Sequence, residues 1–206
     1  EAPGAIPYVG RLFKSTSEFS VLPKGVFDLS VARACDHQVE RALARLPEWD
    51  PTTCIARHHL LADLDRFLSA SEPVYVLSAS TDAGKTWALA QFAAVRLADT
   101  PRVWATGDDL ADVNSLAALI HSELASMSQS TRTPDELLSA WLAETVEQGT
   151  MPIVIIDNIG PSSQQYMQRY QGALSRLAYD AQEHGVRLVL SVNEAVLHGY
   201  KPTAGV

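Results

Sequence analysis

The chain has 206 residues and a mass of 22.4 kDa, enough for one sizeable domain and a small appendage but not for two full domains. Its hydrophobic fraction of 47% and its charged fraction of 19% are typical of a globular protein and argue against disorder. The net charge is −8, and Arg132 is the only basic residue between Trp104 and Gln168. This charge does not indicate a protein that binds nucleic acid by covering its phosphates.

The sequence shows no feature of a membrane or secreted protein. No apolar run approaches the roughly 20 residues of a membrane helix, and the first residues lack the basic-then-apolar pattern of a signal peptide. The two cysteines, Cys35 and Cys54, form neither a disulfide framework nor a metal-ligand cluster, and both read as small buried apolar residues. We therefore expect a cytoplasmic protein in a reducing compartment, with no membrane segment.

The N-terminal part of the chain reads as an arm followed by short helices. Residues 1–24 contain scattered proline, glycine and serine without a sustained period. Residues 29–46 have helical apolar spacing that ends at Pro47, and residues 57–67 form a second short helical pattern. We predict an N-terminal arm and helix over residues 1–50 and a separate core over residues 51–206.

From residue 74 onward, apolar strand-length runs alternate with helical patterns. The predicted strands cover residues 74–77, 102–105, 153–156 and 187–193, and the predicted helices cover residues 87–98, 108–127, 134–148 and 161–184. Asp108 or Asp109 is expected to cap the second of these helices, and Thr133-Pro134-Asp135-Glu136 forms a capping box before the third. The alternation predicts a three-layer α/β fold, with a parallel sheet flanked by helices.

The segment between the first strand and its helix matches a phosphate-binding loop. Residues 79–86 read Ala-Ser-Thr-Asp-Ala-Gly-Lys-Thr, with alanine at the first glycine position of the pattern, which requires either a negative φ there or some strain. Backbone N–H groups of such a loop hold phosphate oxygens, the lysine reaches the β- and γ-phosphates and the threonine hydroxyl ligates Mg²⁺. The predicted nucleotide-binding residues here are Ser80, Thr81, Asp82, Ala83, Gly84, Lys85, Thr86 and Trp87.

A second candidate ligand follows the most apolar strand, residues 153–156. Asp157 comes directly after it, and a carboxylate at this position can meet the Mg²⁺ that bridges nucleotide phosphates. We therefore predict Thr86 and Asp157 as the metal ligands.

Together these motifs resemble those of the P-loop NTPases, and more narrowly of the AAA+ and STAND branches. Residues 79–86 are similar to the Walker A motif and residues 153–157 to the Walker B motif, and the resemblance covers roughly residues 54–194. It implies catalytic roles for Lys85 and Asp157. It also implies ATP as the nucleotide, Mg²⁺ as the metal, and self-association or further domains of a larger chain as partners.

The resemblance extends to two weaker motifs. Asn193, which ends the last predicted strand, is similar to the sensor 1 residue that orients the attacking water in these families. Ile55-Ala56-Arg57 stands where these families place a segment that borders the adenine, so Ile55 and Arg57 join the predicted nucleotide-binding residues.

Two departures from the family pattern affect the expected activity. Asn158 stands where AAA+ ATPases usually carry a catalytic glutamate, and an amide cannot act as a general base. Thirteen residues follow Asn193, too few for the fifth strand and the helical lid of the family, and they include no arginine. Hydrolysis is therefore expected to be slow, to use another carboxylate such as Glu194, or to be absent, and the core is expected to lack the C-terminal lid.

The sequence thus predicts a Mg-dependent, ATP-binding NTPase module whose nucleotide state controls assembly or signalling, with weak or assembly-dependent turnover. Two alternatives stay open. Asn158 and the missing lid favour a non-hydrolysing nucleotide-binding scaffold, whereas a small-molecule kinase shares the phosphate loop but usually has more arginines than this chain.

Overall fold

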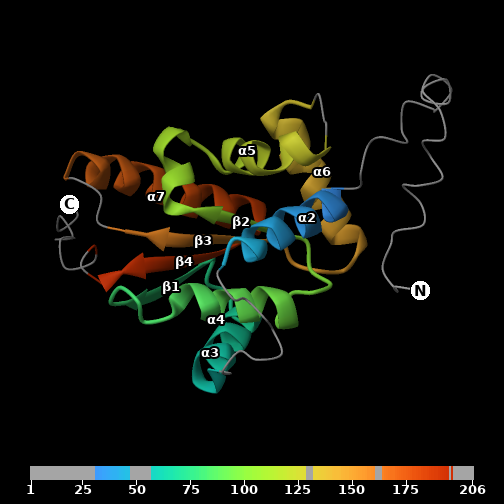
Figure 1. The fold of residues 1–206 in the computed structure, drawn as a ribbon. Helices are drawn as coiled ribbons and strands as arrows, with labels where there is room; N and C mark the ends of the chain where they lie inside the picture. Colours follow the sequence, from blue (N-terminus) through green and yellow to red (C-terminus); the bar gives the residue numbers. More distant parts are fainter. Residues whose placement is uncertain (1–30, 47–56, 129–131, 161–163, 195, 197–206) are drawn as a thin grey trace, which may run out of the picture.

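Four parallel strands form the centre of the molecule in a computed structural model that describes residues 31–46, 57–128, 132–160, 164–194 and 196 (Figure 1). The strands are β1 (Val74–Ala79), β2 (Arg102–Thr106), β3 (Ile153–Ile159) and β4 (Arg187–Asn193). The α-helices are α2 (Val31–Ala44), α3 (His58–Ser69), α4 (Lys85–Gln91), α5 (Leu116–Ser128), α6 (Pro134–Glu147) and α7 (Gln164–His184). The predicted three-layer α/β fold is confirmed.

The strand order β1-β4-β3-β2 determines which strand ends are neighbours in the sheet. All three pairings are parallel, and in register they bring Ala79 opposite Asn193 and Thr106 opposite Asp157. The carboxyl ends of the four strands therefore share one edge of the sheet. This is the edge at which open α/β sheets bind their ligands.

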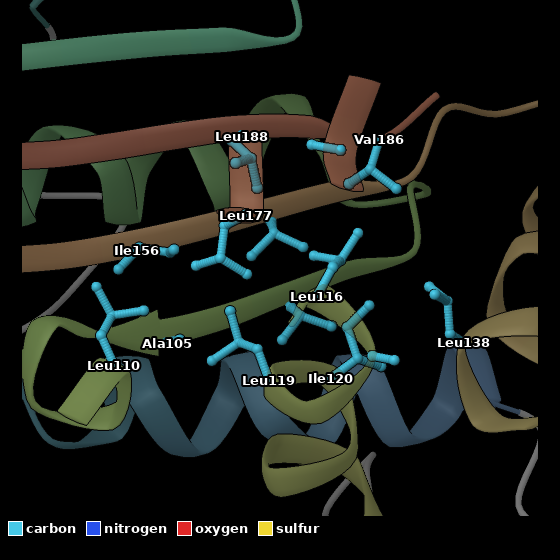
Figure 2. Close-up of a cluster of buried hydrophobic side chains, with 14 of the residues drawn as sticks. Ala105, Leu110, Leu116, Leu119, Ile120, Leu138, Ile156, Leu177, Val186 and Leu188 are labelled. Atoms are coloured by element: carbon cyan, nitrogen blue, oxygen red, sulfur yellow. The ribbon is translucent and has the colours of Figure 1, made fainter. Parts of the chain in front are cut away.

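Helices cover both faces of this sheet because the central strands are apolar on both sides. In β3, Val154 and Ile156 belong to the core with α5, α6 and α7, whereas Ile153 and Ile155 belong to the core with α3 and α4. Figure 2 shows the first core, in which Ile156 and Leu188 of the sheet face Leu119 of α5 and Leu177 of α7. This alternation in β3 produces the two outer layers.

Helix α2 packs along the β2 end of the sheet (Figure 1). Its residues enter both cores, with Cys35 in one and Val39 in the other. Two polar contacts attach it to β2: Arg102 pairs with Asp36 at 3.1 Å, and the backbone N–H of Trp104 donates to Gln38 Oε1 at 2.8 Å. The predicted burial of Cys35 is confirmed, whereas Cys54 lies outside the described residues.

Several predicted elements have other bounds in the structure, and three of them differ most. The helix predicted at residues 108–127 is instead a 3₁₀-helix (Gly107–Asp112) followed by α5, and its cap is Thr106, with Asp109 as the reciprocal partner of the capping box. The helix predicted at residues 87–98 begins at Lys85 and continues after α4 as a π-helix (Phe92–Arg96). Strand β3 continues three residues past its predicted end, to Ile159.

No helix in the described part of the chain is long and apolar enough to cross a membrane. The arm predicted at residues 1–24 lies outside the described residues, as do residues 161–163, where the last helix was predicted to begin.

The capping box of α6 provides a test of the local structure. Thr133 Oγ1 accepts from the backbone N–H of Glu136, and the Glu136 carboxylate accepts from the backbone N–H of Thr133 at 2.8 Å and from its hydroxyl at 2.9 Å. We expect Thr133→Ala to lower the free energy of unfolding by about 1 kcal/mol, measured by urea denaturation. Ser139→Ala, at an exposed position within α6, serves as the control and should not lower it.

The same box predicts a pH dependence. The hydrogen bonds from Thr133 lower the pKa of Glu136, because they favour its ionised form. A carboxyl group whose folded-state pKa is lowered stabilises the protein above its unfolded pKa, and this contribution is lost as the pH falls through the folded value. The difference in unfolding free energy between wild type and Thr133→Ala should therefore shrink in acid, and an unchanged difference would contradict the capping geometry.

Candidate phosphate-binding site

The loop between β1 and α4 has the backbone that its sequence requires. Asp82 and Gly84 have positive φ angles of 61° and 74°, and Gly84 is the N-cap of α4. Aspartate and glycine are the residue types that tolerate this conformation. Ala79 is the last residue of β1 and is not among the positive-φ residues of the described chain, so alanine at the first glycine position introduces no strain there.

Lys85 folds back over this loop. Its Nζ donates hydrogen bonds to the backbone oxygens of Ala79 at 2.9 Å and of Ser80 at 2.8 Å. The residue is half-buried. Both acceptors are neutral carbonyl groups, which leaves the charge of the ammonium group at the loop uncompensated by these bonds.

The end of β4 contacts the loop directly. Asn193 Nδ2 donates to Thr81 Oγ1 at 2.6 Å, because β4 pairs with β1 and brings Asn193 beside the start of the loop. A polar side chain at this place can contact both the loop and whatever the loop holds. The predicted juxtaposition of Asn193 with the phosphate loop is thus present, while its role as a sensor stays a prediction.

Asp157 is buried in β3 without a hydrogen bond to one of its oxygens. The residue is 4% exposed, and its Oδ1 has no donor in the described structure. Buried carboxylate oxygens are normally paired, so an orphaned one at the ligand-binding edge of the sheet indicates a missing cation or donor. Thr86 and Asp157 line the same cavity, and their hydroxyl and carboxylate oxygens are the hard donors that Mg²⁺ prefers.

The protein does not supply a complete metal cage by itself. Within the described ranges, no group of three or more His, Cys, Asp or Glu side chains is placed to hold a metal ion. Thr86 and Asp157 would therefore hold Mg²⁺ together with phosphate oxygens and water, which is how Mg²⁺ is usually bound at nucleotide sites.

Asn158 adopts a left-handed conformation with a φ of 57°. Its backbone oxygen lies 2.7 Å from where a Cβ on Gly107 would stand, so this conformation depends on glycine in the neighbouring segment. Asparagine tolerates such a φ better than glutamate does. The absence of a glutamate after Asp157 therefore has a local backbone reason.

Arg57 lies against the phosphate loop. Its Nη2 is 2.5 Å from the position that a Cβ on Gly84 would occupy. The structure thus brings a second cation to the loop beside Lys85. Ile55, the other residue predicted near the adenine, lies outside the described residues.

Two neighbouring cavities open at this edge of the sheet. The loop cleft, of about 450 Å³, is lined by Thr81, Asp82, Gly84, Lys85, Thr86, Trp87, Asn158, Gly160, Ser191 and Asn193. The α2 cavity, of about 550 Å³, is lined by Gln38, Arg41, Ala42, Arg45, Leu46, Thr86, Trp104, Thr106, Asp109, Ser122, Glu123, Asp157 and Asn158. Thr86 and Asn158 line both, so the expected metal position adjoins both cavities.

The two cavities contain polar residues that sequence reasoning missed. Ser191 lines the loop cleft, and its hydroxyl is buried without a partner in the described structure. It is a polar residue inside the otherwise apolar strand β4, two positions before Asn193, and this pattern could have identified it. Glu123 lines the α2 cavity, and burial chiefly raises its pKa, while the hydrogen bond from Gln38 opposes this shift.

Comparison with known proteins gives little further information. No family model matches the chain, and no curated protein matches it. Among solved structures, the fold is similar to Cdc6p from Pyrobaculum aerophilum, with a TM-score of 0.45 and 18% sequence identity over 82% of this chain. The chain covers 45% of that protein, and a similarity this distant assigns neither family nor function.

The contact between Arg57 and Gly84 can be tested against a matched glycine. Gly149 also has a positive φ, 64°, but no atom lies within 4 Å of the position of its missing Cβ. Gly149→Ala should therefore show only the backbone cost of about 1 kcal/mol, whereas Gly84→Ala should cost slightly more, because the new methyl group meets the end of the flexible Arg57 side chain, which must shift.

Removing the guanidinium should relieve that additional cost. We expect the unfolding free energy lost on Gly84→Ala to be smaller when it is introduced into Arg57→Ala than into wild type, as measured by denaturation of the four proteins in a double-mutant cycle. Equal losses in the two backgrounds would show that Arg57 does not press on the loop.

Proposed function

We propose that this chain is a Mg-dependent, ATP-binding NTPase module whose nucleotide state controls assembly or signalling of a larger protein. The observation that carries the proposal is the orphaned Oδ1 of Asp157, which lines one cavity with Thr86 at the end of the phosphate-type loop. The loop has residues with positive φ, a lysine and a buried carboxylate nearby. Together these are the groups needed to bind a phosphate chain with its divalent cation.

Each residue has a distinct part in this binding. Lys85 would exchange its two carbonyl acceptors for phosphate oxygens, which are charged and therefore stronger acceptors. Arg57 contributes a second positive charge at Gly84. Thr86 and Asp157 would hold Mg²⁺, which supplies neutralisation of charge on the β- and γ-phosphates. ATP in place of other nucleotides rests on the resemblance to the AAA+ and STAND branches.

The contact between Asn193 and Thr81 supports a control by the nucleotide state. This hydrogen bond joins the end of β4 to the phosphate loop, so a γ-phosphate that competes for either group would change how the two segments meet. Only contacts that differ between the ATP and ADP states can shift a conformational equilibrium. Asn193 would make such a contact.

A non-hydrolysing scaffold is the second candidate, and the backbone at Asn158 favours it. The left-handed conformation of Asn158 removes the usual place for a carboxylate base, and the residue offers only an amide. Such a protein would bind Mg-ATP and hold it, with the bound nucleotide acting as a structural element. Phosphate release measured beside binding separates this candidate from a slow ATPase.

Calorimetric titration with Mg-ATP tests the loop. We expect Lys85→Ala to lose at least tenfold in affinity, because charge-assisted hydrogen bonds to phosphate contribute about 1.5–3 kcal/mol. Arg96→Ala removes an exposed cation that pairs with Asp65 away from the loop, and it should bind as wild type does. Circular dichroism checks that both variants fold, and equal affinity of wild type and folded Lys85→Ala would exclude the loop as the site.

Asp157→Asn tests the metal position. The variant keeps the shape of the side chain but removes its charge, so Mg-dependent nucleotide affinity should fall towards the value measured in EDTA. Its free energy of unfolding should stay the same or rise, since an unpaired buried charge is removed. An equal loss of affinity with and without Mg²⁺ would assign Asp157 a role other than metal binding.

A further inference from the structure

The α2 cavity is larger than the loop cleft and directly adjoins it. It is lined by residues of β2 and β3, including Trp104 and Asp157, and by residues of α2, of the segment after α2 and of α5. The buried carboxylate of Asp157, with its unpartnered oxygen, lines this cavity and not the loop cleft. A ligand in the α2 cavity would therefore lie next to the expected metal and the end of the phosphate chain.

Two arginines provide the positive charge of this cavity. Arg41 lies in the last turn of α2 and Arg45 directly follows the end of this helix, and both line the cavity. Neither side chain forms a hydrogen bond or an ion pair with another residue in the described part of the chain. Two guanidinium groups in one cavity can bind the oxygens of a phosphoryl group with their forked donors.

The cavity is also lined by a polar network of hydrogen-bonded side chains. Gln38 donates to Glu123 Oε2 at 2.8 Å and to the backbone oxygen of Trp104, and it accepts from the N–H of Trp104. These bonds hold the Glu123 carboxylate in place and leave its second oxygen without a partner among the described residues. Glu123, Arg41 and Arg45 line the same cavity, and the two positive charges favour the ionised form of Glu123, against the larger effect of burial, which raises its pKa.

We propose that the α2 cavity is a second ligand site, which binds the phosphoryl group of a further small molecule on Arg41 and Arg45 beside the bound nucleotide. The proposal rests on the proposed function, because the loop cleft is then filled by ATP and the α2 cavity is the free space next to it. Glu123 is a negative charge in the same cavity, and it would compete with the phosphoryl group for the two guanidinium groups. Thr86 and Asn158 belong to both sites, so occupancy of each affects the affinity of the other.

Equilibrium dialysis with labelled inorganic phosphate tests the proposal on the chain saturated with Mg²⁺ and a non-hydrolysable ATP analogue. The analogue fills the phosphate loop, so phosphate that still binds occupies another site. We expect one phosphate per wild-type chain and at least a tenfold weaker affinity in Arg41→Ala/Arg45→Ala. Arg66→Ala/Arg96→Ala, which removes two exposed cations outside the cavity, is the matched control and should bind phosphate as wild type does.

Two further variants test the recognition itself. Arg41→Lys/Arg45→Lys keeps the charge but loses the forked donors, so its affinity should fall between those of wild type and the alanine pair. Glu123→Gln removes the competing negative charge and should bind phosphate several-fold more tightly than wild type. No phosphate bound to the loaded wild type, or equal binding by the alanine pair, would overturn the second site. Displacement of phosphate by an equal concentration of succinate would overturn the phosphoryl assignment.

Failure of the nucleotide proposal would be visible separately. If the wild type does not bind the ATP analogue, the same dialysis is run without nucleotide on Lys85→Ala and on Arg41→Ala/Arg45→Ala. Phosphate bound by Lys85→Ala and lost from the arginine pair would support the α2 site although the ATP site had failed. The opposite pattern would support only the loop.

Discussion

The central constraint in this structure is a carboxylate oxygen that is buried without a partner. Removing an ionised carboxylate from water costs several kcal/mol even after the protein relaxes, and hydrogen bonds or a cation normally offset this cost. Asp157 lies in the middle of the sheet, between β2 and β4, and its Oδ1 receives no such bond in the described structure. A site that only stabilised the fold would have an apolar residue at this position, as its four neighbours in β3 are. The position is therefore best explained by something that binds there.

The strand order brings Asp157 to the same edge of the sheet as several other polar segments. Because β4 lies between β1 and β3, Asn193 reaches Thr81 of the loop, while Asp157 stands one strand further and Thr106 beyond it. The loop, the carboxylate and the polar end of β4 are far apart in the sequence. They meet only because all four strands are parallel and end at the same edge. The close packing of Ile153 to Ile156 on both faces keeps this edge in register.

Much of this arrangement could be predicted from the sequence, because it depends on local signals. Apolar runs of strand length, the capping box at Thr133 and the pattern at residues 79–86 each specify their own structure within a few residues. The errors arose where a local signal had two solutions. Asp108 or Asp109 was expected to be a helix cap, but Thr106 provides the cap and Asp109 its partner, so the helix start was predicted two or three residues too late.

The α2 cavity could not be predicted, because it depends on contacts between distant residues. Gln38 meets Trp104 across 66 positions, and no periodicity or motif in either segment indicates this pairing. The same holds for the neighbourhood of Glu123, which depends on how α5 and α2 pack together. Ser191 is an intermediate case. Its strand was predicted correctly, but a single polar residue in an apolar strand does not indicate which site it lines until the sheet order is known.

Helix α2 therefore has two effects that cannot be separated. It covers the β2 end of the sheet, where an exposed strand would offer its backbone groups to another chain, and it is fixed there by Arg102 and Gln38. In covering β2 it also carries Arg41, and Arg45 directly after its end, to the cavity beside Asp157. A shift of α2 along β2 would change both the cover of this strand and the charge near the expected metal. The segment that precedes the sheet is thus connected mechanically to the edge where the nucleotide is proposed to bind, and this connection requires no contact between α2 and the phosphate loop itself.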